Sequence, residues 1–329
     1  MICLGILFGG KSFEHEISIV TAYQLKKRLS NNYKIHMIYI SLDGDFYLAD
    51  QMQMKDFRLE NFKKLKKLKL NKLHLDVLVG AMHGENGEDG LAACFAKINH
   101  LKYLGCDVFA ASTAMDKYRS FLFLNSNGVE MVPTTYYSYQ DYLDNQPLPY
   151  LPCILKPTKG GSSLGIEVVL EEDDAADKLS KAFHYTEELI IQPYYNDLEE
   201  FNLALNETEF SNLEKIHKKD SIFSFDNKYS DSFKVMHQSL IEDSSYPDFC
   251  KVARRVYDLL DARGIIRIDF FKINDVIYVN EVNTTPGALA MYLFPDFDAV
   301  FKESLDRVIK EQDRKYPNTH YLLKNNINK

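Results

Sequence analysis

Asp269, Glu281 and Asn283 are suited to cation binding, because carboxylate and amide oxygens are ligands that Mg²⁺ prefers. Glu281 and Asn283 are two residues apart, so a strand would place both side chains on one face. Both lie among apolar residues and are followed at once by the rigid turn Thr284–Gly287. The pattern is also compatible with solvated acids on a half-buried hairpin, but together with the motifs below it predicts a magnesium–nucleotide site.

A β-hairpin is needed to bring the first of these residues to the other two. The strand-like runs IIRIDFF and VIYVNEV flank a polar break at Asn274–Asp275. A three-residue loop, Asn274–Val276, would place Asp269 directly opposite Glu281 across the hairpin. Arg267 would then share a face with Asp269 and add a positive charge beside the carboxylates.

A second group of residues is suited to phosphate binding. Lys156 ends a strand predicted over Cys153–Lys156 and leads into the loop PTKGGSSLG, whose glycines allow backbone N–H groups to close over phosphates. A strand over Ile166–Leu170 follows with no helix between, so the loop differs from the P-loop and from the dinucleotide fingerprint. Glycine-rich hairpin loops without ligands are as common, but we interpret this one as a flexible flap over ATP.

Residues Gly5–Ser12 match the P-loop pattern letter for letter, yet they do not fit its geometry. In a P-loop the strand precedes the first glycine, whereas Ile6-Leu7-Phe8 inside this match belongs to a strand itself. We therefore predict a strand, a turn at Gly9-Gly10 and a helix whose start carries Glu14. Glu14 is either an acid favoured by the helix dipole or a group that reaches over the strand ends, where open α/β sheets bind ligands.

The loop HGENGEDG, residues 83–90, is a third candidate. Its glycines and acids form either a plain turn or a strand-end loop that borders a substrate. His83 lacks partners at metal-ligand spacing, so a structural histidine and a catalytic one remain alternatives.

Strands and helices that could position these groups alternate over the first third of the chain. The apolar run Ile2–Phe8 has the length of a buried strand, and a helical pattern follows as far as Leu29, where Ser30-Asn31-Asn32 ends it. Strands over Ile35–Leu42 and Asp76–Met82 complete a pattern that predicts a parallel α/β layer. Later elements are predicted as a helix over Met115–Asn127, a strand over Leu189–Gln192, a hinge at Pro193–Leu198 and a helix over Asp248–Ala262.

The composition is that of an ordinary globular protein, with 46% hydrophobic and 26% charged residues. The net charge of −8 gives no electrostatic case for nucleic acid as a partner, and we interpret the basic run Lys63–Lys72 as a solvated helix or loop. Five scattered cysteines without a C-x-x-C motif indicate reduced thiols. The apolar start lacks a basic leader and no segment has the length of a membrane span, so we expect a soluble cytoplasmic protein with no membrane contact.

Six motifs occur in the order LFGGKSFEHEIS, HGENGEDG, MDKYRS, ILKPTKGGSSLGI, the pair Lys228–Tyr229 and RIDFF…YVNEVNTTPG. In this order they resemble the D-alanine–D-alanine ligase family of the ATP-grasp superfamily, over nearly the whole chain. The resemblance implies an α/β, ATP-grasp fold in which an N-terminal parallel α/β domain is followed by two α+β lobes that sandwich ATP. The implied boundaries are 1–111 for the first domain, 112–198 for the lobe with the flap and 199–329 for the lobe with the metal-binding hairpin.

The resemblance also implies roles for individual residues. ATP would be held by Lys117, Lys156, Gly161, Ser163, Gln192, Tyr195, Glu200 and Lys228, with the two lysines 117 and 156 on phosphates, the segment Gln192–Tyr195 on adenine and Glu200 on ribose. Two Mg²⁺ ions, or Mn²⁺, would be held by Asp269, Glu281 and Asn283. The catalytic set would be Glu14, Ser162, Tyr229, Arg267, Gly287 and Tyr292. Glu14 would meet the ammonium of the first D-alanine, and Arg267 with the Gly287 N–H would stabilise an oxyanion.

The implied reaction forms D-alanyl-D-alanine for peptidoglycan precursors through an acyl phosphate, and the implied assembly is a homodimer. Two features depart from the family pattern. Tyr292 stands where many members have a serine that binds the carboxylate of the second D-alanine, and Gln192-Pro193 stands where Glu-Lys is usual. The first departure leaves D-lactate and D-serine as alternative acceptors. A nucleotide-binding regulator without turnover is disfavoured, because binding alone needs no oxyanion stabiliser such as Arg267.

Overall fold

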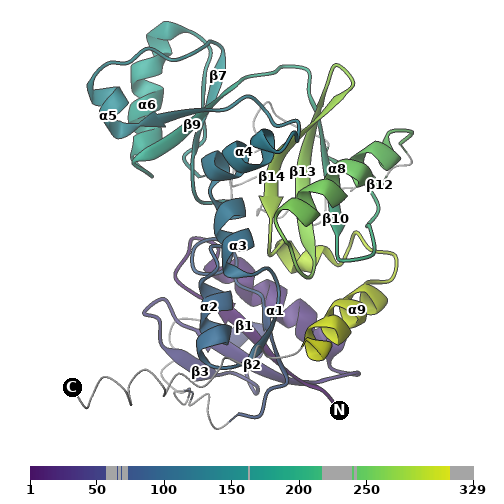
Figure 1. Cartoon of the computed structure of the whole chain (residues 1–329). Helices are drawn as coiled ribbons and strands as arrows, with labels where there is room; N and C mark the ends of the chain where they lie inside the picture. The colour runs from purple at the N-terminus through teal and green to yellow at the C-terminus, as the bar shows by residue number, and fades with distance from the viewer. Residues whose placement is uncertain are drawn as a thin grey trace, which may run out of the picture.

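The structure is a computed structural model, and it describes residues 1–56, 65, 68, 73–161, 164–216, 239–240 and 243–311. Within these residues the chain forms three sheets, each with its own helices (Figure 1). The first sheet has the strand order β3-β2-β1-β4-β5, the central sheet β6-β9-β7-β8 and the third sheet β12-β11-β10-β13-β14.

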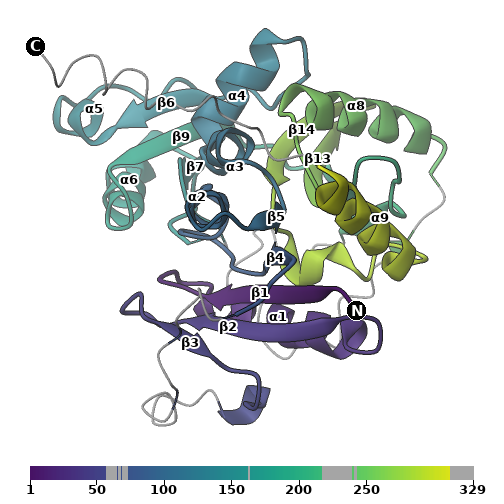
Figure 2. The ribbon, with the colours of Figure 1, turned by 60° about the horizontal axis from the view of Figure 1, so that its bottom comes forward.

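The first sheet confirms the predicted parallel α/β layer. Its members are β1 (Cys3–Gly9), β2 (Lys34–Ile40), β3 (Phe46–Leu48), β4 (Val77–Gly80) and β5 (Lys102–Leu104), with helices α1 (His15–Leu29) and α2 (Leu91–Ile98). Strands β1, β2, β4 and β5 pair in parallel, and β3 adds an antiparallel edge (Figure 2). Sequence analysis did not predict β3 and β5, because three residues carry too little periodicity. Gly5 lies inside β1, which confirms that the P-loop match belongs to a strand.

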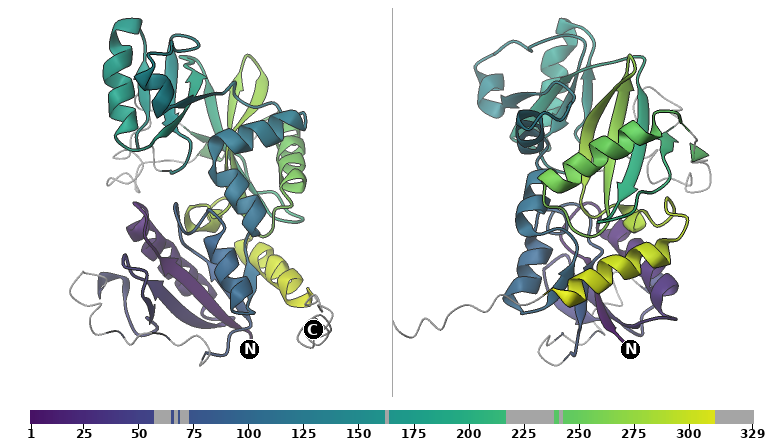
Figure 3. Two further views of the ribbon diagram at one scale, coloured as in Figure 1. Left: turned by 60° about the vertical axis from the view of Figure 1, so that its left-hand side comes forward. Right: turned by 45° about the vertical axis from the view of Figure 1, so that its right-hand side comes forward.

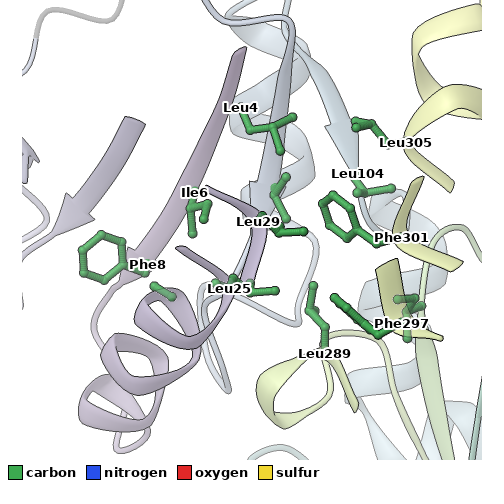
Figure 4. Packing of buried hydrophobic residues seen from close by; sticks show 14 of the residues in the cluster. Leu4, Ile6, Phe8, Leu25, Leu29, Leu104, Leu289, Phe297, Phe301 and Leu305 are labelled. Carbon is green, nitrogen blue, oxygen red and sulfur yellow. The ribbon is translucent and has the colours of Figure 1, made fainter. Parts of the chain in front are cut away.

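The core of the first sheet is completed by a helix from the far end of the chain. Helix α9 (Phe297–Lys310) buries Phe297, Phe301 and Leu305 in the same cluster as Leu4 and Leu25 (Figure 4). The Phe301 ring also lies 6.0 Å from that of Tyr33, centroid to centroid. The third sheet is thereby anchored to the first, because residues 284–296 join its last strand to α9.

Helices α3 (Val108–Met115) and α4 (Lys117–Ser126) lie between the first sheet and the other two (Figure 1). The prediction of one helix over Met115–Asn127 was wrong at its start. Asp116 has extended backbone angles and caps α4, since its side chain accepts a hydrogen bond from the Arg119 N–H at 3.0 Å. The break makes Lys117 the first residue of α4.

The central sheet is antiparallel throughout. It consists of β6 (Thr135–Ser138), β7 (Cys153–Pro157), β8 (Glu167–Val169) and β9 (Glu188–Pro193), with helices α5 (Tyr139–Leu143) and α6 (Ala175–Phe183). Strands β7 and β8 pair from Cys153 and Val169 inward, so the glycine-rich loop joins two neighbouring strands as predicted.

The third sheet is also antiparallel, and helix α8 (Tyr246–Leu259) packs against it (Figure 3). Its strands are β10 (Glu199–Leu205), β11 (Glu214–Ile216), β12 (Ser239–Leu240), β13 (Ile266–Ile273) and β14 (Val276–Asn283). A 3-10 turn, η6 (Gly287–Ala290), follows β14 and leads toward α9.

The β13–β14 hairpin reaches the predicted pairing by a different route. The loop has two residues, Asn274 and Asp275, both with positive φ (48° and 64°), so the predicted three-residue loop was wrong. This turn alone would place Asp269 opposite Asn280. A β-bulge between Asp269 and Phe270 shifts the register by one residue, and Asp269 therefore pairs with Glu281.

The structure can be compared with two further predictions, that the cysteines are reduced and that no segment has the length of a membrane span. All five cysteines are free. Among the described residues, no helix has both the length and the apolar character needed to cross a membrane.

Replacing Phe301 by Ala is expected to lower the free energy of unfolding by about 3–5 kcal/mol, because the side chain is 1% exposed and its removal leaves a cavity between α9 and the first sheet. Denaturant unfolding measures the change. The matched control is Lys302→Ala, at a side chain that is 65% exposed, which should change stability by less than about 0.5 kcal/mol. Equal effects of the two substitutions would contradict the packing described for α9.

Candidate active site

Two adjoining cavities lie where the three sheets meet. The smaller has a volume of about 100 Å³ and is lined by Lys117, Lys156, Gly160, Gly161 and Glu281, among others. The larger has a volume of about 1000 Å³ and is lined by His83, Arg267, Gly287 and Tyr292, among others. Glu14, Glu88 and Asn283 line both cavities, so these three residues mark the place where the two join.

The two carboxylates of the hairpin are each paired with a cation. Arg267 binds Asp269 with two hydrogen bonds, Nε to Oδ1 at 2.7 Å and Nη2 to Oδ2 at 3.0 Å. Burial alone would lower the pKa of Arg267, but the Asp269 carboxylate outweighs it and raises that pKa. The Lys117 Nζ lies 3.1 Å from the Glu281 Oε1 and donates to the Gly160 carbonyl at 2.7 Å.

Lys156 reaches the site from the central sheet. It is 7% exposed, and its Nζ donates to the Asn280 Oδ1 at 3.2 Å and lies 5.6 Å from the centre of the Phe271 ring. Asn280 is the extra residue of the β14 bulge, so the irregularity that sets the carboxylate pairing also supplies a contact for this lysine.

Glu14 precedes α1 directly after the loop from β1, and glycines surround its carboxylate. A Cβ added to Gly84 would lie 2.8 Å from the Glu14 Oε2, and one added to Gly161 would lie 3.1 Å from it. Gly84 also has a φ of +69°, a backbone conformation that residues with a side chain rarely adopt. The loop after β4 and the glycine-rich loop after β7 can therefore both approach Glu14. The sequence left two roles for Glu14, an acid favoured by the helix dipole or a side chain that reaches over the strand ends. This placement favours the second role.

His83 is a buried histidine with both ring nitrogens engaged. Its Nδ1 donates to the Thr285 carbonyl at 2.9 Å, which leaves Nε2 to accept from the Thr21 hydroxyl at 2.8 Å. Burial lowers the pKa of His83, so the ring is neutral. Thr21 in turn accepts from the Ala288 N–H at 3.2 Å. The described contacts favour the structural role, which ties the turn after β14 to α1 and β4.

Glu88 is a residue that sequence analysis did not single out. Its carboxylate accepts from the Gly84 N–H at 2.8 Å and from the Thr285 N–H at 3.3 Å. Burial, followed by the charge of Glu14, raises the pKa of Glu88 to about 8. Its position in a loop rich in glycine and acids was visible in the sequence, but its proximity to Glu14 is a tertiary contact.

The residues predicted to hold adenine and ribose lie outside the lining of these two cavities. Gln192 is buried, its Nε2 donates to the Thr134 hydroxyl at 2.9 Å, and its Oε1 has no hydrogen-bond partner among the described residues. Tyr195 is half-buried, and burial raises its pKa. Glu200 lies on β10 beside Phe271 of β13.

Some predictions fall on residues outside those described. They are Ser162 and Ser163 of the glycine-rich loop, the pair Lys228–Tyr229, and most of the basic run Lys63–Lys72.

The donor set on the hairpin fits a hard cation. Asp269, Glu281 and Asn283 offer carboxylate and amide oxygens, the ligand type that Mg²⁺ prefers. Among the described residues, no three His, Cys, Asp or Glu side chains gather into a metal-binding group. Metal binding there would depend on the amide and on oxygens from a ligand.

Comparisons with known proteins agree with this architecture. The family model described as "D-ala D-ala ligase N-terminus" matches residues 3–106, and the one described as "D-ala D-ala ligase C-terminus" matches residues 139–303. A D-alanine–D-alanine ligase of Nitratiruptor sp. is 33% identical over 333 residues, covering 94% of each chain. One of Campylobacter lari is 35% identical over 316 residues, covering 89% of each.

Solved structures give the same result. The crystal structure of the D-alanine–D-alanine ligase from Helicobacter pylori superposes with a TM-score of 0.77 at 27% identity, over 96% of this chain and 100% of that one. The VanG D-Ala:D-Ser ligase from Enterococcus faecalis also has a TM-score of 0.77, over 93% of this chain and 99% of that one, but at 21% identity it shows the fold alone.

The three sheets, the loop between β7 and β8 and the hairpin of carboxylates define an ATP-grasp protein. Within that class, the chain belongs to the D-alanine–D-alanine ligase family.

We expect the free energy of unfolding of Glu88→Gln, relative to that of the wild type, to increase as the pH rises from 4.5 to about 8. Below this window the carboxyl is protonated in the folded and the unfolded state. Within it the unfolded chain has lost the proton that the folded protein keeps, so wild-type stability falls with rising pH. Above it the difference is constant.

Thermal unfolding of both proteins across this pH range measures the effect. The matched control is Glu85→Gln, which removes a carboxylate from the same loop at an exposed position. A constant difference in melting temperature between wild type and Glu88→Gln would show that Glu88 titrates normally.

Proposed function

We propose that this protein joins two D-alanines into D-alanyl-D-alanine, with conversion of ATP to ADP and phosphate, for peptidoglycan precursor synthesis. The observation that carries the proposal is the junction of the two cavities at Glu14 and Asn283. The smaller cavity has lysines and glycine backbone suited to phosphate, and the larger is lined by Arg267 and Gly287. The relatives that support the substrate are named D-alanine–D-alanine ligases.

In this proposal the smaller cavity takes the phosphates of ATP. Lys117, Lys156 and the backbone at Gly161 would bind them, because two lysines and backbone N–H groups neutralise anionic oxygens. The remaining nucleotide contacts are proposed for Ser163, Gln192, Tyr195, Glu200 and Lys228. The Gln192 Oε1 has no hydrogen-bond partner among the described residues, which supports a contact with adenine. This oxygen can accept a hydrogen bond from an amino group such as that of adenine.

Asp269, Glu281 and Asn283 would hold two Mg²⁺ ions, with Mn²⁺ as a substitute. When bound, the metal would neutralise the charge that gathers on the phosphate oxygens. The cations that pair with these carboxylates in the described structure, Arg267 and Lys117, would then be available to the substrates.

The larger cavity would take the two amino acids. Glu14 would accept hydrogen bonds from the ammonium of the first D-alanine, in a hydrogen-bond chain with Ser162 and Tyr229. The carboxylate oxygen of the first D-alanine attacks the γ-phosphorus of ATP, which forms D-alanyl phosphate and releases ADP. The amine of the second D-alanine, after losing a proton, attacks the acyl carbon, and Arg267 with the Gly287 N–H would bind the oxyanion until phosphate leaves. Closure of the site would keep water from the acyl phosphate.

The proposal extends to the whole protein. We propose the units 1–111, 112–198 and 199–329 as the N-terminal domain and the two ATP-grasp lobes, and a homodimer in the cytoplasm. Family membership supports these statements.

The direct test is incubation with ATP, Mg²⁺ and D-alanine, with phosphate release and product mass measured together. D-Alanyl-D-alanine formed from the D-isomer, and not from L-alanine, is the expected result. Parallel reactions with D-lactate or D-serine added test the alternative acceptors. Phosphate release that requires one of these acceptors would make the protein a ligase of that acceptor, and no turnover with any substrate would reject the proposal.

Replacing Arg267 by Ala is expected to lower kcat by about 10²–10³-fold with the affinity for ATP nearly unchanged, because the guanidinium would act on charge that develops in the transition state. Steady-state kinetics and calorimetric titration with ATP measure the two effects. Arg263→Ala is the matched control, since Arg263 lies four residues earlier and pairs with Glu311 away from the cavities. Unchanged turnover in Arg267→Ala would exclude the assigned role.

A further inference from the structure

A row of polar side chains crosses the third sheet. Cross-strand pairs link Glu214 to Asn202, Asn202 to Asp269 and Asp269 to Glu281, in strands β11, β10, β13 and β14. Side chains of residues that pair directly lie on the same face of a sheet, so the two hairpin carboxylates belong to a row of four. The function proposed above uses only Asp269 and Glu281 of this row.

Glu214 is the buried end of the row. It is 2% exposed, and its Oε2 accepts from the Asn202 Nδ2 at 2.9 Å and from the Tyr292 hydroxyl at 3.1 Å. Burial raises the pKa of the Glu214 carboxyl, while the Asn202 hydrogen bond and the charge of Arg267 lower it. Among the described residues, the side chains of Asn202 and Tyr292 donate the hydrogen bonds to this buried carboxyl, which would be costly to bury if they left their positions.

Tyr292 connects Glu214 to the larger cavity. The residue lines that cavity and is 38% exposed, whereas its hydroxyl donates to Glu214, which does not line it. The hydroxyl proton is therefore already used within the protein. The ring is therefore the part of Tyr292 that remains available to a molecule in the cavity. Arg267 and Gly287 line the same cavity. In this geometry the Tyr292 hydroxyl is engaged with Glu214 and is not available to donate to a substrate carboxylate.

We propose that Glu214 is a positioning residue of the acceptor site, which fixes the Tyr292 ring as a wall of the larger cavity and so limits the size of the accepted amino acid. This inference rests on the function proposed above. Either Glu214→Gln, which removes the charge, or Tyr292→Phe, which removes the hydroxyl and keeps the ring, weakens the link. Both variants loosen the same wall, so their effects have the same direction, and the double variant adds nothing beyond Tyr292→Phe.

The test is a competition between equimolar D-alanine and D-2-aminobutyrate, which is one methylene larger, in the presence of ATP and Mg²⁺. Mass spectrometry with fragmentation gives the ratio of product with D-2-aminobutyrate at the C-terminal position to D-alanyl-D-alanine. This ratio is expected to rise on the order of tenfold in Glu214→Gln, in Tyr292→Phe and in the double variant, since one methylene in a pocket accounts for discrimination of that size. KM for ATP should stay unchanged.

The control is Glu207→Gln, because Glu207 is a partly buried glutamate that also accepts two hydrogen bonds, from the Gly264 N–H and the Ser304 hydroxyl, away from the cavity. It should leave the product ratio unchanged. A higher KM for the second D-alanine in Tyr292→Phe, with no change of KM in Glu214→Gln, would show that the hydroxyl binds the substrate. That result would overturn the inference. So would additive effects of the two substitutions.

A second readout does not depend on catalysis. The melting temperatures of the two single variants and the double variant should be non-additive, because both substitutions act on the same hydrogen bond, which Tyr292→Phe removes and Glu214→Gln weakens. If the wild type makes no dipeptide, the proposed function fails, while non-additive melting temperatures would still establish the Glu214–Tyr292 link. Additive melting temperatures would reject that link whatever the activity.

Discussion

The site depends on the compensation of carboxylates that are held close together in a partly buried place. Asp269 and Glu281 pair across a hairpin, and two like charges side by side are unfavourable unless cations lie between or beside them. Arg267 compensates the first from the same strand. Lys117 compensates the second from the start of α4. The third sheet and the α3–α4 segment must therefore meet at this hairpin, and the other contacts of the site are arranged around that meeting.

Contacts from the first sheet place the larger cavity against the same hairpin. His83 after β4 and Thr21 on α1 bind the backbone of the turn that follows β14. Glu14 is approached by loops from the first and the central sheets, which is possible because Gly84 and Gly161 have no side chains. Helix α9 packs into the core of the first sheet, against apolar residues of β1 and α1. This packing supports the contacts between the third sheet and the first.

Much of the fold follows from local patterns. The buried run of β1, the helix that ends near Leu29 and the two strands around the glycine-rich loop were all predictable from periodicity and turn residues. The short strands β3 and β5 and the break between α3 and α4 were not. Three-residue strands exist because neighbouring strands bind them, and the break exists because Asp116 caps α4, which local propensity does not distinguish from a continuous helix.

The sequence by itself determined which chemical groups are available: carboxylate and amide oxygens two residues apart on a strand, a lysine before a glycine-rich loop, and an acid at the start of the first helix. Tertiary structure decided how these groups are used. The pairing of Asp269 with Glu281 needs a bulge that compensates a two-residue turn. Glu88 beside Glu14, and Tyr292 on Glu214, are contacts between segments far apart in the chain. Residue types and spacing specify local geometry, whereas burial and charge pairing arise only when distant segments pack together.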